Sequence, residues 1–157
     1  MNTVEHNKKY AVGMGAGLVA TIVMSMMMLV KAKMGLMPEL DPIQMLGNMT
    51  GGGRSVGWIL HFAIGTVLWG LLYAAIFGEH IRGAWWRGAV FATGAWMLMM
   101  VVVMPMAGAG LFGLAMGIAA PVMTLMMHLV FGVVLGATYG ALLKRQDREV
   151  TRHVGAH

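Results

Sequence analysis

The sequence predicts an all-α fold: a membrane bundle of four transmembrane helices, built as two tandem parallel helical-hairpin repeats. Of its 157 residues, 59% are hydrophobic and only 11% are charged, and the mean hydropathy is +0.74. This composition is typical of membrane proteins, because a soluble domain of this size could not bury so much apolar surface. Four mostly apolar stretches reach the roughly 20 residues that a spanning helix needs: residues 11–33, 56–78, 84–105 and 119–143.

Charged residues and prolines mark where these spans end. Lys31 and Lys33 close the first span, and we expect their long side chains to reach the lipid headgroups. Pro105 ends the third span, since proline breaks a helix interior, and Pro121 suits the first turn of the fourth. Charged residues also follow the second and fourth spans: Glu79, His80 and Arg82 after the one, Lys144 and Arg145 after the other.

The distribution of basic residues predicts the topology. The tails, residues 1–10 and 144–157, and the loop between the second and third spans carry eight lysines and arginines, whereas the opposite side carries three. By the positive-inside rule, both tails are cytoplasmic, and residues 11–143 form the transmembrane domain of a bacterial inner-membrane protein. The eight are Lys8, Lys9, Arg82, Arg87, Lys144, Arg145, Arg148 and Arg152, and the three are Lys31, Lys33 and Arg54.

The two connections on the outer side differ in chemistry. Glu39 and Asp41 lie in a turn bracketed by prolines, where they could collect cations at an outer mouth. Alternatively, the turn is simply solvated, and Asp41 caps a short interfacial helix over residues 43–50. The connection 106–117 carries no charge and is rich in glycine, so we expect it to dip into the interface or to pack on the bundle.

Two histidines inside the apolar spans are the strongest functional clue. His61 and His128 each precede a glycine by four residues and a tyrosine by eleven or twelve, and this shared pattern is the main sign of the repeat. From His128 onwards glycines recur every four residues, so the histidine heads a helix-packing stripe. The candidate packing seams, whether within one chain or between chains, comprise Gly13, Gly17, Gly65, Gly132, Gly136 and Gly140.

An ionisable side chain within a membrane span suggests a functional site, and three uses of this pair are physically sensible. His61 and His128 could ligate a b-type haem, or contribute to a copper or zinc site. They could relay protons, since histidine titrates near neutral pH. They could also hydrogen-bond neighbouring helices and serve packing alone.

Methionines surround the expected depth of these histidines. The chain has 19, and all except Met1 and Met14 fall in the outer half of the bundle or in its outer loops. Thioethers beside imidazoles suit Cu(I), whereas the alternative is that methionine acts as a flexible apolar filler, with some side chains facing lipid. The pairs with i, i+4 spacing, which are the candidate soft ligands, are Met24 and Met28, Met100 and Met104, and Met123 and Met127.

No recognisable catalytic motif occurs in the sequence: there is no P-loop, no G-x-S-x-G, no H-E-x-x-H and no dinucleotide fingerprint. The chain has no cysteine, which excludes disulfides and thiolate metal sites. Its basic pI reflects topology rather than nucleic-acid binding. We therefore expect a protein that is not an enzyme.

The sequence also resembles an uncharacterised family of small bacterial four-helix integral membrane proteins, a domain of unknown function. The resemblance covers about residues 13 to 143 and implies a four-helix inner-membrane protein without assigning an activity. The abundance of methionine departs from the family pattern, so the resemblance implies no copper role. The residues that carry it are Gly17, Ala20-Thr21, Met24-Ser25, Pro38-Glu39-Leu40, His61-Phe62, Gly65, Trp69-Gly70, Gly88, Trp96, Met104-Pro105, Ala107 to Gly113, His128, Gly132, Gly136 and Tyr139.

These observations favour a non-enzymatic structural or accessory membrane component that packs with itself or in a larger membrane complex. Two alternatives use the histidines: a haem- or Cu(I)-binding membrane protein with His61 and His128 as ligands, and a small ion or solute channel or transporter. The expected cofactor is none under the first interpretation, and b-type haem or copper under the second.

Overall fold

The computed structural model describes residues 3–78 and 83–154, and side chains over 7–78, 83–146 and at 148. Within these ranges the chain is helical without strands, and four helices are long and apolar enough to cross a membrane: Asn7–Lys33, Gly53–Phe77, Ala84–Met106 and Ala119–Gln146. The predicted fold class is confirmed. The charges that were expected to end the second span, Glu79, His80 and Arg82, lie outside the described residues.

The first and fourth spans are single helices, whereas the second and third are each made of three consecutive segments. The helices continue into both predicted tails, since lysine and arginine are good helix formers and do not stop a helix. The elements are α1 (Thr3–Lys33), α2 (Pro42–Met49), α3 (Gly53–Phe62), η1 (Ala63–Trp69), α4 (Gly70–Phe77), α5 (Ala84–Leu98), η2 (Met99–Val103), α6 (Met104–Met106), η3 (Leu111–Met116) and α7 (Ala119–Val154).

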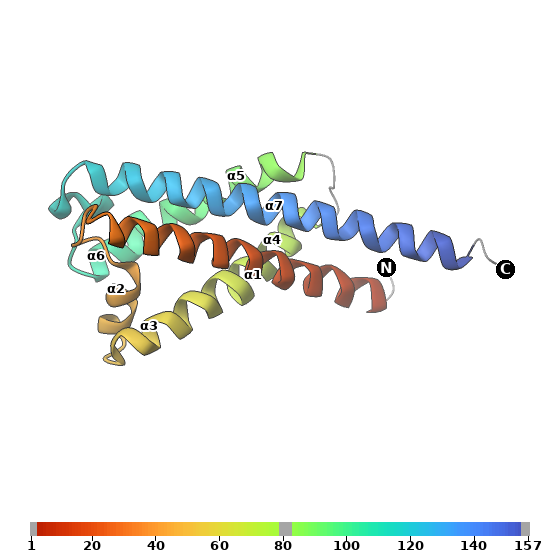
Figure 1. Cartoon of the computed structure of the whole chain (residues 1–157), viewed down its shortest axis with the longest axis horizontal. Helices are drawn as coiled ribbons and strands as arrows, with labels where there is room; N and C mark the ends of the chain where they lie inside the picture. The colour runs from red at the N-terminus through yellow and green to blue at the C-terminus, as the bar shows by residue number, and fades with distance from the viewer. Residues whose placement is uncertain (1–2, 79–82, 155–157) are drawn as a thin grey trace.

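Figure 1 shows α1 and α7 side by side along the length of the molecule. Helix α4 packs on α1, and α5 packs on α7, so the chain forms two helical hairpins joined through α1 and α7. Both termini lie at one end of the bundle, the terminal end, and α2 and α6 lie at the other, the loop end. At the loop end, α2 and α3 diverge from the other helices.

Glycines allow the helices of the first hairpin to approach closely. A Cβ atom added at Gly13 would collide with the backbone of Gly70, and one at Gly17 with the carbonyl oxygens of Gly65 and Thr66. Small residues at such positions let two backbones touch, which is how helices associate in lipid. The seam predicted at Gly13, Gly17 and Gly65 is therefore an intramolecular one.

The second hairpin has a corresponding seam. A Cβ atom at Gly132 would meet Gly88 and Ala92 of α5, and one at Gly136 would meet the carbonyl of Ala84. Gly140, the last residue of the predicted stripe, is also buried. The glycine stripe after His128 thus packs α7 on α5 within one chain. That the two hairpins are copies of one repeat stays a prediction.

Two wide π-helical segments interrupt the second and third spans. η1 begins two residues after His61 in the second span, and η2 lies near the end of the third. The hydroxyl of Thr66 in η1 is buried and has no hydrogen-bond partner among the described residues. π segments are rare and occur frequently at functional sites.

The two connections at the loop end, one after the first span and one after the third, agree with the sequence-based expectations. Asp41 caps α2, with its carboxylate accepting a 3.0 Å hydrogen bond from the Gln44 amide, so the predicted short helix and its cap are confirmed. In the uncharged connection, Ala109 is buried and the ring of Phe112 lies against Trp96 at 5.9 Å. This connection therefore packs on the bundle.

An aromatic core holds the two hairpins together towards the terminal end. The rings of Tyr73 and Tyr139 meet edge to face at 5.3 Å, and Tyr73 makes the same kind of contact with Phe91 at 5.5 Å. Both tyrosines are 1% exposed. The Tyr73 hydroxyl donates to the Ala84 carbonyl at 2.9 Å, which satisfies a polar group that hydrocarbon would leave unpaired.

Candidate functional site

His61 and His128 line the same cavity, which has a volume of about 190 Å³. All four spans and α2 contribute to its walls, and the cavity lies in the half of the bundle nearer the loop end. Both π-helical segments border it, η1 through Gly65 and η2 through Met99. The structure therefore brings together two residues that are 67 positions apart in the sequence.

His128 is oriented by its own helix. Its Nδ1 lies 2.8 Å from the carbonyl oxygen of Thr124, one turn earlier in α7. A carbonyl only accepts, so Nδ1 carries the proton and donates. In the neutral imidazole this leaves the lone pair on Nε2. An imidazole held in this way by a carbonyl is the usual arrangement for a histidine that ligates a metal.

His61 is oriented by α1. Its Nε2 lies 3.0 Å from the Ser25 hydroxyl, which itself donates to the Thr21 carbonyl at 2.8 Å. Because a hydroxyl has a single proton, Nε2 of His61 must donate to Ser25. The neutral ring then keeps its lone pair on Nδ1, so the two histidines have opposite tautomers.

Thr124 has a second connection, to the third span. Its hydroxyl accepts from the Trp96 indole N–H at 3.1 Å and donates to the Ala120 carbonyl at 2.8 Å. The residue is 3% exposed. Thr124, which orients His128, is thus hydrogen-bonded to α5, and this contact restricts the position of the histidine.

Thioethers form much of the remaining wall. Four of the predicted soft-ligand methionines line the cavity, Met24, Met28, Met104 and Met127. Three that the spacing argument did not select line it as well. Met99 is in η2, and the other two, Met45 and Met49, are contributed by α2. No helical periodicity within the spans could have indicated α2, because it is a separate element folded against them.

The remaining methionines pack or face outwards. Met100 is fully buried beside Leu40 and Met104, and Met123 packs at the edge of the same cluster, so neither lines the cavity. Met100 and Met104 therefore share a face, as their i, i+4 spacing predicted, although only Met104 reaches the cavity. Other methionines face outwards, as expected for a flexible apolar filler: Met26 is 59% exposed, Met126 63% and Met97 44%.

The two predicted mouth carboxylates do not line this cavity. Glu39 is exposed, and Asp41 pairs with Arg54, which lies just inside α3. Partial burial raises the pKa of Asp41, but the hydrogen bond from the Gln44 amide and the hydrogen bond and charge of Arg54 outweigh it and hold that pKa below its usual value. Asp41 therefore acts as an ionised helix cap.

Among the described residues, no three histidine, aspartate or glutamate side chains lie close enough together to hold a metal ion. A metal in this cavity would have to be bound by imidazole and thioether. The ligand candidates are thus two oriented histidines and the methionines around them. Ser25 and Thr124, which orient the histidines, are candidate site residues that the sequence reasoning did not select, although each directly follows a selected methionine, Met24 or Met123.

Comparison with known proteins gives the family. The description "Family of unknown function (DUF6789)" matches residues 7–150. The chain belongs to that family. No curated protein and no solved structure matches the sequence. The resemblance to a domain of unknown function is therefore confirmed, with a longer reach than residues 13 to 143. The DUF6789 assignment agrees with four membrane-spanning helices and names no activity.

Proposed function

We propose that this DUF6789 protein is a multi-pass membrane protein that binds Cu(I) in the cavity between His61 and His128. The observation that carries the proposal is the composition of one cavity wall: two imidazoles and seven methionine side chains contributed by four spans and α2. Imidazole and thioether are ligands that suit Cu(I), and soft sulfur ligands select it over hard divalent cations. The methionines are Met24, Met28, Met45, Met49, Met99, Met104 and Met127.

The hydrogen bonds of the histidines support the same role. Each ring donates one N–H to the protein, His128 to a carbonyl and His61 to a hydroxyl, and keeps one lone pair. Orienting partners of this kind raise the basicity of a metal-ligating imidazole. Methionine has three rotatable side-chain bonds, so the thioethers could close around an ion without movement of the backbone.

The volume of the cavity favours an ion over haem. At about 190 Å³ it is smaller than the roughly 300–1,000 Å³ of pockets that hold drug-sized molecules. A bis-histidine haem would need its macrocycle between the two rings, and the helices around them would have to separate. Purified protein should accordingly show no Soret band, and a Soret band would favour haem.

A titration of the purified protein tests the proposal. We expect one Cu(I), or Ag(I) as a redox-inert probe, per chain in competition with a chromophoric chelator. His61→Ala and His128→Ala should each weaken binding at least about 10-fold, the lower end of the effect of losing a metal-site group. Met26→Leu is the matched control for Met28→Leu, because Met26 lies on the same helix but is largely exposed.

Absence of stoichiometric copper binding, or equal binding by both histidine variants, would contradict the proposal. That result would favour a structural or accessory membrane component. In such a protein the methionines would serve packing, as Met28 and Met127 do in their buried cluster with Ile43. This second candidate predicts that mild detergent extraction recovers an oligomer of this chain or a larger complex. Recovery as a lone monomer would count against it.

We also propose that the membrane is a bacterial inner membrane and that both termini are cytoplasmic. The support is the excess of lysine and arginine at the terminal end, where α1 begins and α7 ends. The copper cavity would then lie in the periplasmic half of the bilayer.

A further inference from the structure

A second cavity, of about 150 Å³, lies at the loop end of the bundle. It is formed where α1 ends and where α2 and α3 begin, and charged residues from all three places line it: Lys31, Asp41 and Arg54. Met28 and Pro42 lie between this cavity and the histidine cavity, because each of these two residues lines both cavities. Nothing in the proposed copper site uses these charges.

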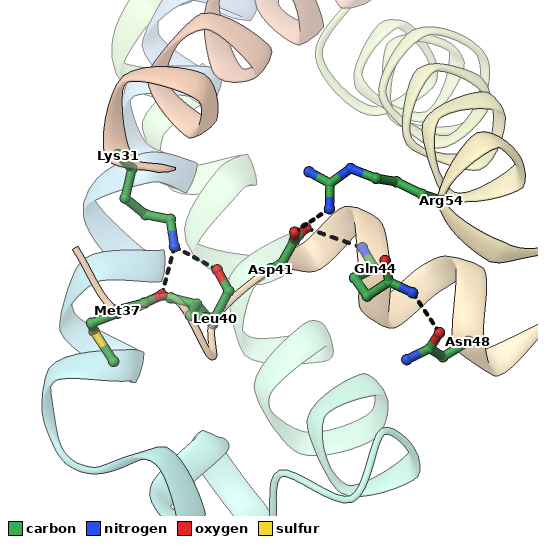
Figure 2. A network of polar contacts seen from close by, with 7 residues as sticks. All are labelled: Lys31, Met37, Leu40, Asp41, Gln44, Asn48 and Arg54. Carbon is green, nitrogen blue, oxygen red and sulfur yellow. Dashed lines mark hydrogen bonds and ion pairs between the residues drawn. The ribbon is translucent and has the colours of Figure 1, made fainter. Parts of the chain in front are cut away.

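Lys31 is held over this cavity by backbone carbonyls. Its ammonium donates to the carbonyl oxygen of Met37 at 2.9 Å and to that of Leu40 at 2.5 Å (Figure 2). A lysine ammonium has three protons, so these two bonds leave one donor. The side chain does not simply extend to bulk headgroups, as the sequence suggested. It is fixed in place with its charge not paired by a contacting carboxylate among the described residues.

Arg54 stands on the other side of Asp41 (Figure 2). Its Nη1 donates to one carboxylate oxygen of Asp41, while the other oxygen accepts from the Gln44 amide. Both Asp41 oxygens are thus engaged within the protein. The guanidinium has five N–H donors, and only one of them is used in this ion pair, so the group can also bind an anion.

The formal charges that line the cavity do not cancel. Lys31 and Arg54 carry +2 and Asp41 carries −1, which leaves +1 for the three groups. One monoanionic group would balance the charges of these three lining groups; Glu39, whose charge also acts on Lys31, does not line the cavity. Phosphate oxygens are good acceptors for both a lysine ammonium and a guanidinium fork.

The apolar part of the wall indicates where such an anion comes from. Leu29, Leu36 and Trp58 also line the cavity, and Leu29 is 50% exposed and Leu36 43% exposed. The cavity lies beside the end of the first span and the start of the second, which is the depth of the headgroups in a bilayer. Tryptophan, lysine and arginine side chains anchor helices at that depth.

We propose that this cavity binds an anionic phospholipid, with the phosphate between Lys31 and Arg54 and an acyl chain along the exposed leucines of α1. The occupant is a lipid rather than a soluble phosphate because the charged groups and the apolar wall meet at the membrane surface. The bound lipid would brace the start of α2 and α3 against α1, at the place where these two helices diverge from the bundle.

Native mass spectrometry with phosphatidylglycerol and phosphatidylcholine tests this proposal. We expect the protein to retain phosphatidylglycerol in preference to phosphatidylcholine. Lys31→Met and Arg54→Gln should each lower that retention about 5-fold, the value of one basic residue at a membrane surface. Lys33→Met is the matched control, because Lys33 carries the same charge two residues away and does not line the cavity.

Helicity and thermal stability in lipid-free detergent show whether each variant folds. If Lys31→Met fails this check, Lys31→Arg replaces it. That variant keeps the positive charge and should retain the lipid. Equal retention of the two lipids by the wild type, or equal loss in Lys33→Met and Lys31→Met, would overturn the proposal. Stabilisation of lipid-free protein by inorganic phosphate as large as that by phosphatidylglycerol would also overturn it, because the ligand would then be a soluble anion.

Discussion

Ser25 illustrates how much of the candidate site depends on single hydrogen bonds. The sequence selected His61 because an imidazole is costly in hydrocarbon, but no pattern in it identifies which of the many hydroxyls faces this ring. Ser25 lies 36 residues earlier, on a different span, and joins His61 to the Thr21 carbonyl. Which ring nitrogen of His61 keeps its lone pair follows from that contact and from no local pattern.

Replacement of Ser25 tests whether it positions His61. In Ser25→Ala the Nε2–H loses its acceptor, so the ring is free to change tautomer or rotate. We expect Cu(I) affinity to fall about 10- to 100-fold, the usual effect of losing an orienting partner, with little loss of thermal stability beyond that of one hydrogen bond. Ser25→Thr keeps the hydroxyl and should retain most of the affinity. Unchanged copper affinity in Ser25→Ala would remove Ser25 from the site.

Asp41 gives a pH-dependent prediction. Its pKa is lowered in the folded protein, so its stabilising effect is complete above the ordinary value of 3.8 and is lost as the pH falls through the lower folded value. Asp41→Ala should destabilise the protein by about 1 kcal/mol at neutral pH through loss of the cap, and the difference from the wild type should shrink as the pH falls below 3.8 and the carboxylate becomes protonated in the folded protein.

Thermal melts of the wild type and of Asp41→Ala in detergent, at neutral and at acid pH, measure this difference in stability. Glu39→Ala is the control, because Glu39 is exposed two residues away and should change stability little. A wild-type advantage over Asp41→Ala that persists undiminished in acid would show that the carboxylate charge does not stabilise α2.

At the scale of the elements, glycine seams decide how the helices pair. The spacing from His128 to Gly140 predicted a packing stripe on the fourth span, and the structure shows that its partner is α5 of the same chain. Spacing within one helix could not name that partner, since it describes one surface only. The π segments η1 and η2 were not predicted either, because the same residues are compatible with an ordinary α-helix.

Two glycines of α5 provide a matched pair of variants. A Cβ atom at Gly88 would collide with the Gly132 carbonyl, whereas nothing lies within 4 Å of one at Gly94. Gly88→Ala should therefore destabilise the protein by about 1–3 kcal/mol through overpacking. Gly94→Ala should stabilise it by roughly 0.5–1 kcal/mol, because alanine loses less backbone entropy in a helix.

The free energy of unfolding in mixed micelles measures both changes. Equal effects of the two substitutions would contradict the intramolecular seam between α5 and α7. A Gly88→Ala protein of normal stability that loses oligomers would place that seam between chains.

At the scale of the whole molecule, the charge asymmetry predicts an orientation that labelling can measure. The chain has no cysteine, so Thr50→Cys in the loop-end connection and Arg148→Cys near the end of α7 report on opposite sides. Both residues are exposed. A membrane-impermeant maleimide should label position 50 in intact spheroplasts and position 148 only after lysis. The reverse pattern would place the termini outside and contradict the positive-inside argument.

By itself, the sequence determined the class of this protein: four apolar spans, their approximate ends, the capped helix after Asp41 and the presence of two intramembrane histidines. These properties depend on hydropathy, proline and capping chemistry, which act over a few neighbouring residues. Only the tertiary structure decided that His61 and His128 share a cavity, that α2 adds thioethers to its wall, and that Lys31, Asp41 and Arg54 surround a second cavity. Those results depend on how separate helices pack: His61 and His128 stand 67 positions apart on different hairpins, and Lys31 and Arg54 stand 23 positions apart on different helices, so no pattern within a few neighbouring residues could place them together.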